Sequence, residues 1–185
     1  SALSRKAQQF QEPINLVIRG VGRLKGRKVV KQNAIDGADK HLLEMTIDSY
    51  SKPEDRQNID GYQYNANVSN AEHAVWVNEA LKKVVVAYRG SRTQEDWLES
   101  DKFIAKGKLE ESPRFKRETE YTKGLVDAIP DDYDITFTGS SLGGTLAYTL
   151  GHAHKKRAVV FNTGVGIDQA KKHGDDDTKF YHAEG

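Results

Sequence analysis

The sequence predicts an α/β fold in which a mostly parallel central sheet carries helices on both faces. Strand-like and helix-like segments alternate along residues 36–185, as in chains that build parallel sheets from βαβ units. Residues 83–88 (KVVVAY) are apolar on both faces of a strand, which is typical of a strand buried between two helical layers. A length of 185 residues allows a single domain with a sizeable core.

The individual elements follow from the spacing of apolar residues and from the residues that end each run. Residues 38–50 favour a helix packed on a sheet, and the polar stretch 51–69 favours a long loop or short edge strands. Pro113 near the first turn and Pro130 beyond the last turn delimit a helix over 110–129. The other expected elements are strands at 74–78, 83–88, 133–138, 158–161 and from residue 179, and a helix at 142–154.

Composition excludes several functional classes. The 28 Lys and Arg residues balance the 27 Asp and Glu residues to a net charge of +1, so no global polyanion binder and no specific nucleic-acid binding is predicted. The absence of cysteine excludes disulfide scaffolds, thiol catalysis and cysteine-ligated metal centres. We expect neither a metal nor an organic cofactor. With no run of about 18 apolar residues and no secretory signal in residues 1–11, we expect no transmembrane segment and favour an intracellular or particle-associated protein.

The N-terminal part of the chain differs in charge from the rest. Residues 1–35 carry eight basic side chains and one acidic side chain, a net charge of +7. This composition predicts a basic arm or loosely packed lead-in at 1–35, followed by a folded domain at 36–185. Two interpretations remain open. The arm grips phosphates, an anionic surface or an acidic partner, or it is a solvated tail that balances an acidic body.

One motif points directly to chemistry, GSSLGG at residues 139–144. It lies directly after an apolar strand and directly before a helix, which is the context of a nucleophile elbow. Glycines at 139 and 143 let the strand and helix backbones pass close to one another, so Ser141 would stand above the sheet at the start of the helix. There the free amides and the helix dipole favour negative charge. The alternative is a glycine-rich turn that binds nothing or binds a phosphate, although the Gly-Lys-Ser/Thr of a P-loop is absent.

Two further segments strengthen this interpretation. Residues 88–101 (YRGSRTQEDWLESD) follow a strand, and residues 159–164 (VVFNTG) follow the helix after the elbow. Together with residues 136–151 they resemble, in order, the oxyanion loop, the elbow and the next strand and turn of the class 3 lipases. These enzymes are the fungal triacylglycerol lipase-like branch of the α/β-hydrolases. The resemblance spans about 42–185 and implies an α/β-hydrolase fold.

The resemblance assigns a role to each matching residue. Ser141 matches the nucleophile, and the backbone amides of Leu142 and Ser91 match the two donors of the oxyanion hole. Segment 101–111 stands where the family often has a lid, and an ordinary connection is the equal alternative. Ser140 departs from the family, which usually has His or another larger residue there, at a position that does no chemistry.

The Asp and His of a catalytic triad are not evident in the sequence. In the family, the Asp follows the strand that corresponds to 179–182, and the His lies further on, whereas this sequence stops at Gly185. We therefore expect both residues, and the C-terminal part of the domain, beyond Gly185. The sequence is then a fragment, is complemented by a separate C-terminal fragment, or is a hydrolase relic. None of the six histidines is placed as the family's catalytic His: His41, His73, His152, His154, His173 and His182.

The function expected from the motifs and the resemblance is the cleavage of carboxylic esters of lipids through an acyl-enzyme on Ser141. A lipid or ester is the expected substrate. The alternative is a catalytically incomplete domain with a structural or interaction role in a larger assembly, in which residues 1–35 hold an anionic partner. A serine peptidase or thioesterase is a weaker alternative, because the RGS…DW element belongs to the lipase-like branch. We expect negligible esterase activity from the 185-residue chain alone.

Overall fold

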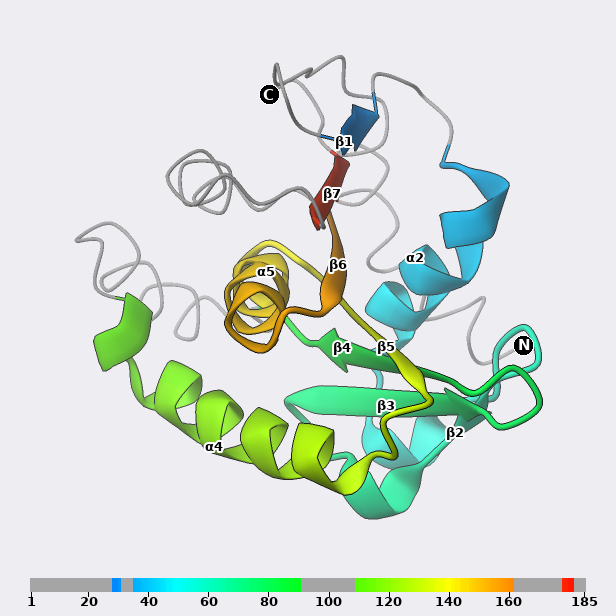
Figure 1. The fold of residues 1–185 in the computed structure, drawn as a ribbon, viewed down its shortest axis with the longest axis horizontal. Coiled ribbons are helices and arrows are strands. Elements are labelled where there is room, and N and C mark those ends of the chain that lie inside the picture. Colours follow the sequence, from blue (N-terminus) through cyan, green and yellow to red (C-terminus); the bar gives the residue numbers. More distant parts are fainter. Residues whose placement is uncertain (1–27, 31–34, 91–108, 162–177, 182–185) are drawn as a thin grey trace.

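A computed structural model describes residues 28–30, 35–90, 109–161 and 178–181, which build one seven-stranded sheet (Figure 1). The strands are β1 Lys28–Val30, β2 Gln63–Tyr64, β3 His73–Asn78, β4 Lys83–Tyr88, β5 Asp134–Ser140, β6 Arg157–Phe161 and β7 Thr178–Tyr181. They lie in the order β1-β7-β6-β5-β4-β3-β2. All neighbours from β1 to β4 in this order are parallel, and β3 and β2 continue the sheet in antiparallel pairing. The predicted mostly parallel sheet is confirmed.

Helices cover both faces of this sheet. Within the described ranges the α-helices are α2 Lys40–Asp48, α4 Pro113–Ala128 and α5 Leu142–His154, with short 3₁₀ helices at Gly37–Asp39, Pro53–Asp55, Ala66–Val68 and Leu109–Glu111. α4 and α5 lie on one face of the sheet, and α2 lies on the other (Figure 1). Each α-helix agrees with its expected range to within three residues.

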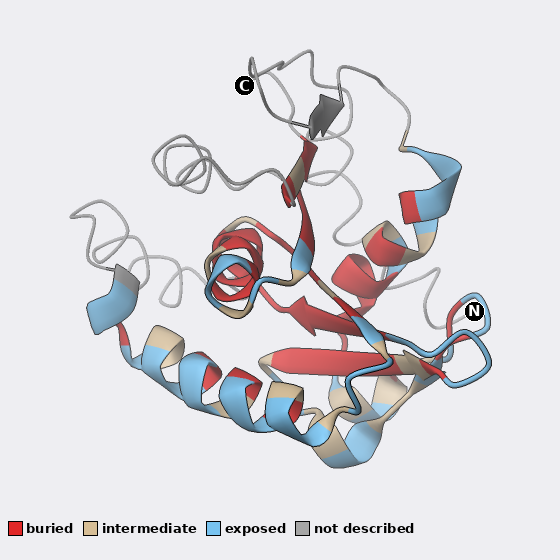
Figure 2. Ribbon diagram, viewed as in Figure 1, coloured by how far each residue is buried: buried red, intermediate tan, exposed pale blue. Residues whose placement is uncertain are grey.

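The central strand β4 shows how the sequence pattern produces the two layers. Val84, Val86 and Tyr88 pack in one hydrophobic cluster with α4 and α5, and Val85 and Ala87 pack in a second cluster with α2. Successive side chains of a strand point to opposite faces, so a strand that is apolar at every position needs a cover on both sides. Figure 2 shows the result, with buried inner strands and an outer face of α4 that is exposed to solvent.

The sheet also includes three residues of the basic segment 1–35. Lys28–Val30 forms β1, which pairs in parallel with β7 so that Val29 lies opposite Phe180. These three residues of the expected basic arm or lead-in therefore pair with the sheet. A three-residue strand among cations and glycines carries too little periodicity to be predicted. Residues 1–27 and 31–34 lie outside the described residues.

Strand register places the ends of β4, β5 and β6 side by side. Tyr88 lies opposite Gly139, and Ser140 lies opposite Phe161. We call this edge of the sheet the carboxyl edge. The starts of the same three strands form the opposite, amino edge, where Lys83 lies opposite Asp134.

Candidate active site

Ser141 lies between β5 and α5 at the carboxyl edge. Its backbone has a φ of 55° and a ψ of −124°, a conformation that costs a non-glycine residue about 1–3 kcal/mol and persists only where its surroundings enforce it. Two backbone hydrogen bonds hold it there. The amide of Ser141 donates to the carbonyl oxygen of Phe161 at 3.0 Å, and its carbonyl oxygen accepts from the amide of Thr145 at 3.1 Å. The turn has the sharp geometry that a nucleophile elbow requires.

Two glycines make this turn possible. A Cβ on Gly139 would lie 2.5 Å from the carbonyl carbon and oxygen of Gly143. A Cβ on Gly143 would lie 2.0 Å from the carbonyl oxygen of Tyr88. Any larger residue at either position would therefore push α5 away from the strands. The expectation that strand and helix backbones pass closely at 139 and 143 is confirmed.

The start of α5 presents free amides beside Ser141. The first hydrogen bond of the helix runs from the amide of Thr145 to the carbonyl oxygen of Ser141, so the amides of residues 142–144 have no acceptor within the helix. They point the positive end of the helix dipole toward the carboxyl edge. Leu142, the first residue of α5, carries one of these amides, and the residue is buried.

Tyr50, just after α2, joins the elbow to the end of β4. Its hydroxyl lies 3.1 Å from Oγ of Ser140 and shares a hydrogen bond with the backbone of Gly90. A Cβ on Gly90 would lie 2.2 Å from the Tyr50 hydroxyl oxygen and 2.8 Å from the carbonyl oxygen of Ser140. Burial raises the pKa of Tyr50 against the opposing effect of these hydrogen bonds, so its hydroxyl stays protonated at neutral pH. Sequence reasoning missed Tyr50 because no local pattern marks it.

Arg114 of α4 supports the backbone where β4 ends. Its Nη2 donates to the carbonyl oxygens of Glu72 at 2.7 Å and Arg89 at 3.0 Å. Its Nε lies 3.2 Å from the carboxylate of Glu118, which is almost fully buried. This support ends one residue before segment 91–108, which lies outside the described residues. That segment contains Ser91, the second expected oxyanion donor, and residues 101–108 of the expected lid.

His73, at the start of β3, is the described histidine that lies at the carboxyl edge. Its Nδ1 is 3.0 Å and 3.1 Å from the two carboxylate oxygens of Glu118, and its ring stacks on Tyr121 with centroids 3.6 Å apart. His73 and Glu118 are both buried. This pair packs α4 against β3, and sequence reasoning did not anticipate it.

The other described histidines lie away from the elbow. His41 is on α2, and His152 and His154 end α5, about 15–20 Å from Ser141 as the helix rise predicts. Among the hydrogen bonds of the described residues, none joins a histidine to Ser141. The histidines outside the described residues are His173 and His182.

Within the described residues, no group of three or more His, Cys, Asp or Glu side chains is placed to hold a metal ion. In the same part of the chain, every helix is too short or too polar to cross a membrane.

Comparisons with known proteins identify one family. Residues 37–178 match the model of a phospholipase-like family described as the Tle-like phospholipase domain. Curated protein sequences give no match. Among solved structures, the chain is similar to the crystal structure of a mutant form of MDLA from Penicillium cyclopium, with 13% sequence identity and a TM-score of 0.38 over 95% of this chain and 70% of that chain.

Proposed function

Because the chain belongs to the family of Tle-like phospholipase domains, we propose that it cleaves carboxylic ester bonds of phospholipids with Ser141 as the nucleophile. Family membership indicates hydrolysis of lipid esters in general. The observation that carries the finer proposal is the backbone of Ser141, a non-glycine residue held at a φ of 55° between a buried strand and a helix. Strain of this kind is expected where a hydroxyl must be presented above the sheet.

In the proposed reaction, Oγ of Ser141 attacks the ester carbonyl carbon and its proton passes to a general base. The carbonyl oxygen becomes an oxyanion, to which the backbone amides of Leu142 and Ser91 donate hydrogen bonds. Loss of one such donor costs about 2.7–4 kcal/mol of transition-state stabilisation. Collapse of the intermediate expels the alcohol part of the lipid, which takes up the proton from the general base, and leaves the acyl group on Ser141. Water then attacks this acyl-enzyme and releases the fatty acid.

We propose a His oriented by an Asp as the general base, as the resemblance to class 3 lipases implies. His73 lies at the correct edge of the sheet, but both oxygens of the Glu118 carboxylate engage its Nδ1. Its ring is also covered by Tyr121. A base must be free to approach the serine hydroxyl, so we assign His73 to packing.

The test is an analysis of the reaction products. It uses the protein at its natural length, which is established by measuring the intact mass of the protein from its source. Incubation with a diacyl phospholipid in mixed micelles should release fatty acid and lysophospholipid. Ser141→Ala should reduce this turnover by about 10⁴-fold or more. Turnover that survives in Ser141→Ala, or release of the phosphorylated head group alone, would contradict the proposal.

The adjacent serine supplies a matched control. A fluorophosphonate probe should label the protein at Ser141, as peptide mapping by mass spectrometry would show, and in Ser140→Ala the label should stay on Ser141. A label found on Ser140 in the unmodified chain, a label lost in Ser140→Ala, or a label that persists in Ser141→Ala would contradict the assignment. Absence of both label and turnover at the natural length would favour the structural or interaction role.

A further inference from the structure

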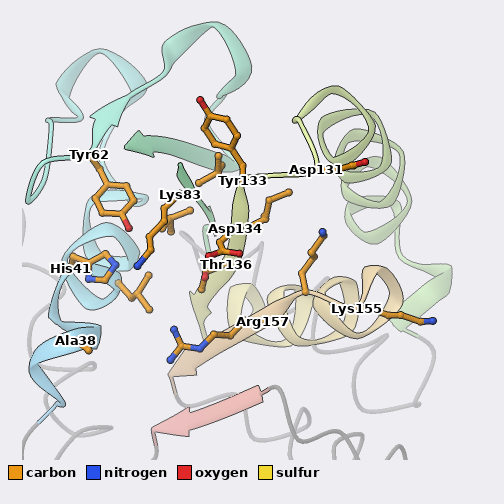
Figure 3. A pocket seen from close by; sticks show the side chains of 15 residues that line it. Ala38, His41, Tyr62, Lys83, Asp131, Tyr133, Asp134, Thr136, Lys155 and Arg157 are labelled. Carbon is orange, nitrogen blue, oxygen red and sulfur yellow. The ribbon is translucent and has the colours of Figure 1, made fainter. Parts of the chain in front are cut away.

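A polar cavity of about 530 Å³ opens at the amino edge of the sheet, at the other end of β5 from the elbow (Figure 3). It lies between α2, the first residues of β4, β5 and β6, and the turns that precede β5 and β6. The length of β5 separates it from Ser141 by about 20 Å. The cavity is therefore distinct from the candidate active site, and its volume falls in the usual range for small-molecule sites.

The cavity gathers basic side chains from two parts of the chain. Those that line it are Lys83, Lys155, Lys156 and Arg157. The acidic residues that line it are Asp131 and Asp134, so the lining carries a net charge of +2. In Figure 3, Lys83 and Arg157 reach toward the side formed by α2, whereas Lys155 and Asp131 point away from the centre. Without Lys155 and Asp131, the remaining residues of the lining still carry a net charge of +2.

The inward cations are poorly neutralised by the described residues. The side chain of Lys83 forms no hydrogen bond or ion pair with them, although Asp134 lies opposite it in the β4–β5 register. Arg157 lies 3.3 Å from Asp39. That carboxylate already accepts from Lys179 at 2.7 Å and from the hydroxyl of Tyr181 at 2.6 Å. Arg157 therefore shares the Asp39 carboxylate, which already accepts hydrogen bonds from Lys179 and Tyr181.

Neutral donors complete the lining. The hydroxyls of Thr136 and Tyr62 and the ring of His41 face the same space, and the His41 and Tyr62 rings stack with centroids 5.2 Å apart. Burial lowers the pKa of His41, and the charges of Lys83 and Arg157 lower it further against the opposing Asp60 and Asp39. His41 is therefore mostly neutral at pH 7, so it does not alter the net charge of the cavity.

We propose that this cavity binds a small phosphate ester, with the phosphate between Lys83 and Arg157 and a hydroxyl or ammonium group of the ligand on Asp134. A phosphate monoester carries a charge close to −2 at pH 7 and therefore matches the lining. Its oxygens accept hydrogen bonds from guanidinium, ammonium and hydroxyl donors together. Because Asp134 lines the cavity beside these cations, we expect a ligand with its own donor group to fit better than inorganic phosphate.

The test is isothermal titration of the full chain with glycerol 3-phosphate at fixed ionic strength, with glycerol and sodium chloride as controls. We expect saturable binding at one site, with neither control binding. Lys83→Gln and Arg157→Gln should each weaken binding by about tenfold, because each removes a charge-assisted contact. Lys82→Gln is the matched control, since Lys82 pairs with Asp132 outside the cavity lining. Its binding should equal that of the unmodified chain.

Two outcomes would overturn the proposal: no saturable binding of glycerol 3-phosphate, or equal weakening by Lys82→Gln and Lys83→Gln. A second readout is the imidazole of His41, whose pKa in an NMR titration should rise when a dianion enters the cavity. Vesicles containing phosphatidic acid separate two sources of the ligand. If the vesicles compete with glycerol 3-phosphate, the site binds a lipid head group. If they do not compete, the site binds a free metabolite.

Discussion

Replacing Gly143 with alanine tests the close approach of α5 to the end of β4 on which the elbow depends. A Cβ there would lie 2.0 Å from the carbonyl oxygen of Tyr88, and 2.9 Å and 3.0 Å from the carbonyl carbons of Tyr88 and Arg89. All three are backbone atoms at the buried end of a central strand, so no rotation of a side chain relieves the contact. The helix must move away by about 1.5 Å to restore normal separation.

The expected cost follows from two opposing effects. Overpacking of a rigid core costs about 1–3 kcal/mol, and a backbone that cannot yield places Gly143→Ala near the upper value. Alanine regains about 1 kcal/mol over glycine within a helix. The free energy of unfolding should therefore fall by about 2 kcal/mol. For a chain of this length, that lowers Tm by about 4–8 °C.

Thermal unfolding followed by circular dichroism measures this change, with Gly124→Ala as the control. Gly124 lies in α4, and a Cβ there would meet nothing within 4 Å. That variant should gain about 1 kcal/mol from helix preference and raise Tm by about 2–4 °C. If Gly143→Ala unfolds at or above the temperature of the unmodified chain, as Gly124→Ala should, the close approach at the elbow is refuted.

Three further predictions concern buried polar groups. Tyr50→Phe removes only the hydroxyl that meets Ser140, so urea unfolding should show a loss of about 1 kcal/mol, and an unchanged midpoint would contradict this. Glu118→Gln removes the carboxylate that Arg114 and His73 share, while Arg114 keeps Glu72 as an ionic partner at 3.3 Å, so the loss in the same assay should be about 2 kcal/mol, and no measurable loss would assign this carboxylate no structural weight. Burial of Asp39 would raise its pKa, but hydrogen bonds and charges from the lysine and tyrosine of β7 outweigh burial and lower that pKa below its usual value. The ionised carboxylate of Asp39 therefore stabilises the fold above about pH 4, and this stabilisation is lost as pH falls through the lowered pKa. The difference in free energy of unfolding between the unmodified chain and Asp39→Asn should shrink below about pH 4. A difference that does not depend on pH would contradict this.

The strand-to-helix turn at Ser141 could be predicted because its requirements are local. Glycines at 139 and 143 stand at set distances from Ser141, and an apolar strand and a helical pattern flank them. The helix expected at 142–154 is α5 to the residue. The contacts that surround the elbow could not be predicted in this way. Ninety positions separate Tyr50 from Ser140, and nothing in either neighbourhood indicates that they meet.

The sequence by itself determined the layered α/β pattern, the central place of a strand apolar on both faces, and the serine on a sharp strand-to-helix turn. These depend on hydrophobic periodicity and turn chemistry, which act over a few residues. Only the tertiary structure decided that Lys28–Val30 pairs with β7 and that α4 supports the end of β4 through Arg114. It also decided that cations from the starts of β4 and β6 converge on one cavity. Parallel strands meet neighbours that are distant in sequence, and their partners are chosen by how both faces of the whole sheet become buried.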